Sequence, residues 1–210
     1  MNTRMNRLSL CVSTLALSLG AAGSHASITG VTGSTNWLLL PPTACGPGQL
    51  QASNGFAHAW DEQLNRPMTL NVDMINNPGT STSAVAGSVS GLYDSHFIHF
   101  EGIPGIVNVT GSVSFSGTIE AVIFTPTNLD NSDVPCGSFG TAYPTTYAFR
   151  GLNPTPQSTF SISGNTLTFS LWAIFPTNQI DQIRVLTKVP APGTAGLLGL
   201  GGLAMVRRRR

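Results

Sequence analysis

The sequence predicts an all-β protein, an antiparallel two-sheet sandwich of jelly-roll-like type. Three observations favour this class. Charged residues make up only 9% of the chain, too few to cover the solvent faces of many helices. Several segments alternate apolar and polar residues, as half-buried strands do. Turn-forming residues separate these segments, with Pro41-Pro42, Asn77-Pro78-Gly79 and Pro104-Gly105 as examples.

The strands follow from this alternation in chain order. In segment 67–74, Met68 and Val72 fall on one face, and Thr69 falls on the other. In segment 112–116, the apolar and serine positions alternate in the same way. The pattern then predicts that Ile119, Ala121 and Ile123 share one face, after a bend or bulge at Gly117. A final strand is predicted over 182–187, and no segment between 27 and 188 predicts a long helix.

A β-hairpin is predicted around the dipeptide Gly164-Asn165. A two-residue turn there pairs Ser163 with Thr166 and sets Ile162 opposite Leu167. The same register sets Phe160 opposite Phe169, so apolar residues meet on one face and hydroxyl residues on the other.

The two ends of the chain carry export features. Residues 1–26 combine two early arginines, an apolar run and a small-residue site, which predicts a signal peptide cut between Ala26 and Ser27. A single domain is then expected over 27–188. At the other end an uncharged, glycine-rich apolar segment over 193–206 precedes four arginines, which predicts a short, marginal membrane helix.

The C-terminal arrangement resembles the PEP-CTERM sorting signal of Gram-negative bacteria. Its residues are the motif Val189, Pro190, Ala191 and Pro192 and the cluster Arg207, Arg208, Arg209 and Arg210. The family has Glu where this chain has Ala191. Segments such as 94–100 and 164–169 are also similar to secreted PEP-CTERM sandwich proteins of unassigned function. The resemblance implies recognition by an exosortase-type membrane protease, an inner-membrane intermediate and a final location at the cell surface or outside the cell.

The charge balance separates the domain from its two ends. Residues 27–188 hold all nine acidic residues but only Arg66, Arg150, Arg184 and Lys188 as basic ones, a net charge of −5. A nucleic-acid partner is therefore not expected, because there is no basic patch to meet phosphates. Neutral polar material such as exopolysaccharide suits this composition better.

Cys45 and Cys136 are the two cysteines of the predicted mature chain. Export places them in an oxidising compartment, and both lie beside glycine or proline in predicted loops. We therefore expect a Cys45–Cys136 disulfide, with two free buried thiols as the alternative.

Candidate metal sites in the sequence are weak, and we predict no metal or cofactor. His96 and His99 lie three apart in a strand and so point to opposite faces, with His58 as a distant third. Asp130 and Asp133 belong to an oxygen-rich segment of the kind that calcium can use, but the spacing matches no complete calcium loop. A solvated turn is expected there instead.

Catalytic motifs are not found, and we expect a non-enzymatic exported surface or matrix protein. Two alternatives stay open. A carbohydrate-binding module would align exposed rings, and the candidates are Trp37, Trp60 and Trp172. A secreted hydrolase would bring two carboxylates together in a cleft. Its candidates include Glu62, Glu101 and Glu120.

Overall fold

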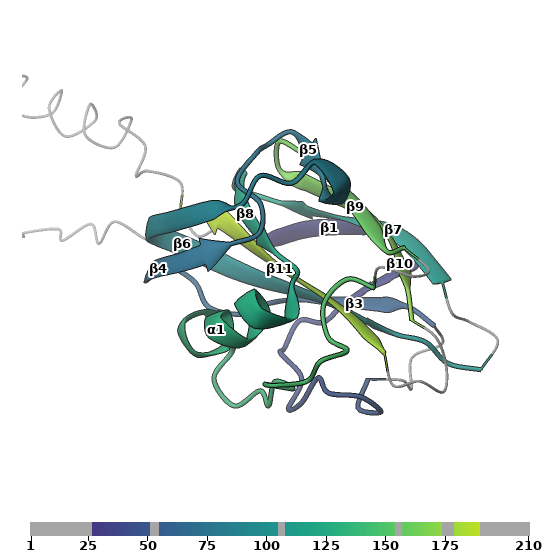
Figure 1. Cartoon of the computed structure of the whole chain (residues 1–210). Helices are drawn as coiled ribbons and strands as arrows, with labels where there is room; N and C mark the ends of the chain where they lie inside the picture. Colours follow the sequence, from purple (N-terminus) through teal and green to yellow (C-terminus); the bar gives the residue numbers. More distant parts are fainter. Residues whose placement is uncertain (1–26, 51–54, 105–107, 154–156, 174–178, 190–210) are drawn as a thin grey trace, which may run out of the picture.

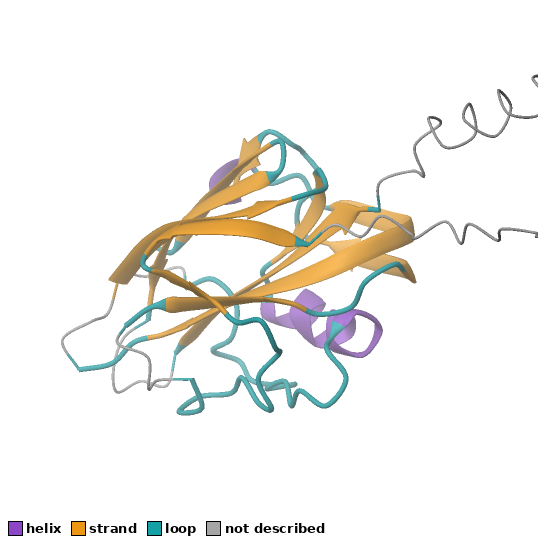
Figure 2. Cartoon of the chain, turned by 180° about the vertical axis from the view of Figure 1, so that it is seen from behind, coloured by secondary structure: helices purple, strands orange, loops and turns teal. Residues whose placement is uncertain are grey.

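The computed structural model describes residues 27–50, 55–104, 108–153, 157–173 and 179–189. Two β-sheets pack face to face, and one helix lies against the outer side of the larger sheet (Figures 1 and 2). The sandwich predicted from the sequence is therefore confirmed. The elements are β1 (Ile28–Gly33), β2 (Thr35–Trp37), β3 (Ala57–Asp61), β4 (Arg66–Val72), β5 (Gly79–Thr80), η1 (Ser81–Ser83), β6 (Gly87–Glu101), β7 (Asn108–Phe115), β8 (Ile119–Ile123), α1 (Pro126–Cys136), β9 (Thr159–Ser163), β10 (Thr166–Trp172) and β11 (Ile180–Lys188).

The smaller sheet, here called sheet A, has the strand order β1-β7-β10-β9-β5 and is antiparallel throughout. Its β9–β10 hairpin has the predicted register, with Ser163 opposite Thr166 and Phe160 opposite Phe169. Gly164 occupies the turn with a φ of 62°, a left-handed conformation that costs glycine little.

The larger sheet, sheet B, has the order β2-β3-β6-β11-β8, and β4 also pairs with β6. Its pairs are antiparallel except β2 with β3, which are parallel. The long strand β6 pairs with β4 along its first half and with β3 along its second half. Strand β11 extends from Ile180 to Lys188 and is therefore longer than the predicted 182–187. Its residues are buried from Ile180 to Thr187.

The chain passes from sheet A to sheet B between β1 and β2, and Gly33 makes this crossing possible. Gly33 has a φ of 66°, and a Cβ there would lie 2.5 Å from the carbonyl oxygen of Thr110. Only glycine fits both the dihedral angle and the close backbone approach. The crossing lets one short N-terminal segment close the edges of both sheets.

The main core lies between the two sheets. It combines alternate residues of β7, β9 and β10 with the inward residues of β6 and β11, for example Val113, Leu167, Ile98 and Val185. These positions are the apolar halves of the alternating segments, so the period-two pattern of the sequence decides the faces.

A second apolar cluster lies on the outer face of sheet B, beneath α1. Trp60 of β3 and Phe97 of β6 pack there with Leu129 and Cys136 of the helix. Two predictions were wrong in this region. Residues 128–133, expected to form a solvated turn, belong to α1, and 27–188 contains this helix although none was predicted. The helix has Pro126 in its first turn and no clear apolar stripe, so its sequence gave little helical signal.

The predicted common face of Ile119, Ala121 and Ile123 was also wrong. The β8–β11 register shifts between Leu186 and Thr187, which places a bulge at the start of β8. Ile119 consequently packs in the core between the sheets, whereas Ala121 and Ile123 pack in the cluster under α1. Alternation holds only while the strand is regular, and a bulge resets it.

Candidate functional site

The first and last residues of the domain, Ser27 and Lys188, lie close to the same loop, at one end of the sandwich. The Ser27 backbone NH donates to Ser116 Oγ at 3.0 Å, and the Lys188 NH donates to the carbonyl of Thr118 at 3.1 Å. Ser116 and Thr118 both belong to the short connection between β7 and β8. The start of the first strand and the end of the last strand therefore both lie next to the β7–β8 connection, and Lys188 is exposed there.

The predicted processing residues are only partly within the described chain. Ser27 and Val189 lie at its two limits, whereas Ala26, Pro190, Ala191, Pro192 and the cluster Arg207–Arg210 lie outside the described residues. In the part of the chain that is described, no helix has the length and apolar character needed to cross a membrane.

Cys45 and Cys136 are free, buried thiols in the structure, so the predicted disulfide is not formed there. Each sulfur has a different neighbour. Cys45 Sγ lies 3.8 Å from the Ala142 carbonyl oxygen, and Cys136 Sγ lies 3.4 Å from the sulfur of Met68. Burial raises the pKa of both thiols to about 12 and keeps them protonated. Compartment and flanking residues suggested the bridge, but they do not bring two Cβ atoms to bonding geometry.

The histidines of β6 point to opposite faces, as predicted. His96 lies between the sheets, where its ring packs on Phe115 and its Nδ1 lies 2.6 Å from Asp61 Oδ1. His99 lies on the outer face, with its Nδ1 3.1 Å from Gln182 Nε2. His58 stands directly across from His99 on β3.

These histidines do not form a metal cluster with other ligands. Among the described residues, no group of three or more His, Cys, Asp or Glu side chains could hold a metal ion. Burial lowers the pKa of His58, and it lowers that of His99 to about 3 with smaller contributions from His58 and Arg150. Both rings are accordingly neutral near pH 7.

The carboxylates of the outer face converge on two buried arginines rather than on an open cleft. Arg184 of β11 donates from Nε to Glu62 Oε2 at 2.7 Å and from Nη2 to Glu62 Oε1 at 2.8 Å. Its Nη2 also lies 3.1 Å from Asp133 Oδ1. The Tyr143 hydroxyl completes the group by donating to Glu62 Oε1 at 2.6 Å.

Arg150 joins the same network from the loop after α1. Its Nη1 lies 2.7 Å from Asp130 Oδ1 and 2.7 Å from Asp133 Oδ2, and its Nε donates to Gln182 Oε1 at 2.9 Å. Asp130 and Asp133, considered for calcium in the sequence, therefore accept guanidinium protons instead. Sequence reasoning missed both arginines. The signal that could have revealed Arg184 is its place inside the apolar run of the last strand, where a charge must be paired.

The other two candidate carboxylates have different surroundings. Glu101 accepts a hydrogen bond from the Gly48 NH at 2.6 Å, and Glu120 lies half-buried on β8. Three surface hollows of the described chain are lined by hydroxyl, amide and apolar side chains, and none of the three is lined by a carboxylate. The carboxylates that do converge, Glu62, Asp130 and Asp133, are paired with arginines between α1 and sheet B.

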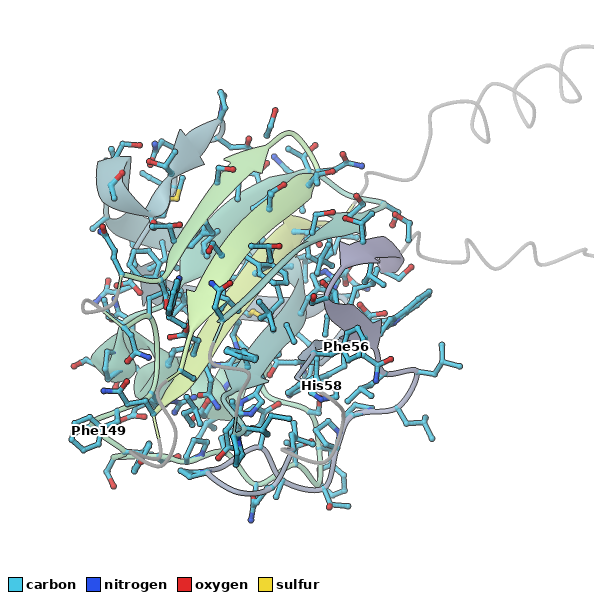
Figure 3. All side chains as sticks on the ribbon, turned by 90° about the vertical axis from the view of Figure 1, so that its right-hand side faces the viewer. Phe56, His58 and Phe149 are labelled. Carbon is cyan, nitrogen blue, oxygen red and sulfur yellow. The ribbon has the colours of Figure 1, made fainter. Side chains whose placement is uncertain are left out.

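The three tryptophans do not form a common platform. Trp60 is fully buried, Trp37 is 37% exposed on the edge strand β2, and Trp172 is half-buried at the end of β10 in the other sheet. Exposed phenylalanines are also dispersed: Phe56 lies beside His58, and Phe149 lies well apart from them (Figure 3). A line of exposed rings, which the carbohydrate-binding alternative predicted, is not formed by the tryptophans.

Comparison of the chain with protein-family models, with curated proteins and with solved structures gave no match.

Proposed function

We propose that this chain is an exported, non-enzymatic component of the cell surface or extracellular matrix, sorted by an exosortase-type membrane protease. The observation that carries the proposal is the composition of the two ends, a signal-peptide pattern before Ser27 and an apolar, arginine-terminated tail after Val189. The sandwich adds support, because its first strand begins at Ile28 and its last ends at Lys188.

The common position of the two ends also supports the proposal. A tail that leaves the domain from an exposed strand end is accessible to a membrane protease without any unfolding of β11. With the tail in the membrane, the loops at the opposite end of the sandwich, near Trp172 and Ile180, would face away from the bilayer. The pairing of the buried carboxylates with Arg150 and Arg184 favours a structural use of these groups over hydrolysis.

Intact-mass analysis of the protein recovered from its native bacterium tests the proposal. The expected species begins near Ser27 and ends between Pro190 and Pro192. Reduction should leave its mass unchanged, and alkylation in denaturant without reductant should modify Cys45 and Cys136, because both thiols are free in the structure.

Two tail variants provide the controls. Replacement of Arg207–Arg210 by alanines should give an unprocessed species that keeps the tail, since the cationic stop is lost. Ala191→Glu, which restores the residue usual in the PEP-CTERM motif, should increase the processed fraction. A wild-type species that retains the four arginines would mean that the tail is not a sorting signal.

A further inference from the structure

The strands of sheet A carry no charged side chain. Every charged residue between 27 and 188 lies on sheet B, on α1 or in a connecting loop, and the five strands of sheet A contain none. A solvated sheet face commonly carries charged side chains, which keep it soluble and unpaired. Sheet A therefore has an unusual outer surface for a domain with a net charge of −5.

Hydroxyl side chains occupy the outer face of sheet A in aligned rows. The inward positions of β7, β9 and β10 are apolar, and the outward positions are Ser or Thr almost throughout. The strand register places Ser161, Thr168 and Ser112 side by side in one row, and Thr159, Ser170 and Thr110 in the next. The result is a grid of groups that both donate and accept hydrogen bonds.

This grid forms the floor of a groove. The segment Thr80–Thr82 lies beside β9, where the Phe160 NH donates a hydrogen bond to Ser81 Oγ at 3.2 Å. Together with the sheet it borders an open hollow of about 440 Å³. A second hollow of about 200 Å³ shares Ser81 and Thr82 and adds the amides of Asn153 and Gln157 and the ring of Phe124. Both hollows are lined without a single charged side chain.

We propose that this groove, over β7, β10 and β9 and bounded by Thr80–Thr82, binds a neutral polysaccharide chain. The proposal rests on the proposed function and names the matrix partner of the exported domain. Sugar hydroxyls both donate and accept, as the side chains of the grid do, and an uncharged glycan leaves no buried charge without a partner. An anionic polysaccharide would bring carboxylates to a face that offers no cation.

The extent of the sheet suits a polymer more than a single sugar. Strand β10 has seven residues, about 23 Å of extended backbone at 3.3 Å per residue. Each neutral hydrogen bond exchanged with water contributes only about 1 kcal/mol, so affinity must come from many equivalent contacts along a repeating chain. Half-buried Trp172 and Asn108 continue the outward positions at one end of the rows.

Affinity electrophoresis in native gels that contain a polysaccharide tests the inference. The gels would hold dextran, hydroxyethylcellulose, the neutral polysaccharide fraction of the native bacterium, or alginate as the anionic comparison. We expect retardation of the protein, with or without its tail, by at least one neutral polymer and no retardation by alginate. Thr168→Glu, at the exposed centre of the grid, should weaken the retarding interaction by about tenfold or more, the effect of losing roughly 1.4 kcal/mol.

Thr69→Glu is the matched control, because Thr69 is, like Thr168, an exposed threonine within a strand. Thr69 lies on sheet B, where its hydroxyl is 3.0 Å from that of Ser90. It should bind like the wild type. Absence of retardation by all three neutral polymers, or equal retardation of the wild type and Thr168→Glu, would overturn the inference. Neither result touches the sorting proposal, which the tail masses decide independently.

Discussion

At the scale of single residues, buried titratable groups give the domain two opposing responses to pH. Asp181 lies at the inner side of β11 and accepts hydrogen bonds from the Trp172 NH at 2.8 Å and the Asn153 NH at 3.0 Å. Burial raises its pKa to about 7 although these hydrogen bonds lower it. His99 is also buried, and its pKa falls to about 3.

The signs of the two effects follow from linkage. For Asp181 the folded state holds a proton that the unfolded state has released, so its stabilising contribution is present below pH 3.8 and is lost as the pH rises through about 7. For His99 the unfolded state binds a proton as the pH falls below 6.5, whereas the folded state stays unprotonated down to about pH 3. The stability of the fold therefore decreases as the pH falls through this range. The two dependences oppose each other between pH 3.8 and 6.5.

Asp181→Asn should therefore make the protein more sensitive to acid. The expected result is a melting temperature that falls more steeply in the variant than in the wild type between pH 7 and pH 5, because the opposing carboxyl has been removed. Circular dichroism melts at pH 5, 6, 7 and 8 measure this slope independently of any overall loss of stability. Thr29→Ala, at an exposed position of β1 without an ionisable group, should run parallel to the wild type. Parallel profiles for Asp181→Asn would show that Asp181 does not titrate in this range.

At the scale of elements, α1 depends on charge pairs more than on its own sequence. Only Leu129, Ser132 and Cys136 of the helix are buried, and its residues include several poor helix formers. The guanidinium of Arg184 reaches the helix through Asp133 and donates from Nη1 to the Leu129 carbonyl at 3.3 Å. The same guanidinium carbon lies 4.8 Å from the centroid of the Phe97 ring.

Arg184→Met should destabilise the domain by about 3–5 kcal/mol, because it leaves Glu62 buried without its counter-charge. Arg184→Lys should recover only part of this loss, since an ammonium cannot reproduce the bidentate contact with Glu62. Equilibrium urea unfolding measures the difference. Arg66→Met, at an exposed arginine of β4, should change stability by about 0.5 kcal/mol or less. A similarly small effect at Arg184 would mean that packing alone holds the helix.

At the scale of the whole molecule, the two sides of the sandwich differ in chemistry. Sheet B holds charged residues, part of the buried arginine network and the packing surface for α1, while sheet A presents an uncharged hydroxyl face. Both share the core between the sheets, to which residues from β1 to β11 contribute. Because first and last strands both take part, the folded unit is expected to extend from Ser27 to Lys188.

A protein limited to residues 27–188 should therefore unfold cooperatively, at a melting temperature within about 2 °C of the processed native form. This agreement is expected because all strands of the described residues and both apolar clusters are retained. Shortening to 27–183 removes Arg184, Val185 and Leu186 from the centre of sheet B and should abolish the cooperative transition. Differential scanning calorimetry of the two forms distinguishes these outcomes, and a cooperative 27–183 form would contradict the assigned role of β11.

Local sequence patterns were enough to predict the all-β class, the faces of most strands and the register of the β9–β10 hairpin. These features follow from alternation and turn residues, which act over a few neighbouring positions. The sequence also determined the uncharged composition of the strands of sheet A, although not that they would lie together. The segment Ile119–Ile123 marks the limit, because one bulge moved Ile119 to the other face.

Three features depend on the assembled fold: the strand pairings beyond the β9–β10 hairpin, the helix over 126–136 and the partners of the buried charges. The order β2-β3-β6-β11-β8 brings together segments that are far apart in the chain, and no local pattern specifies it. The local sequence around Asp130 and Asp133 is typical of a solvated loop. In the fold, both carboxylates form ion pairs with arginines from other segments, Arg150 and Arg184. Long-range ion pairs and sheet order are therefore the parts of this protein that its local sequence could not show, because their energy depends on contacts made only when the whole fold is assembled.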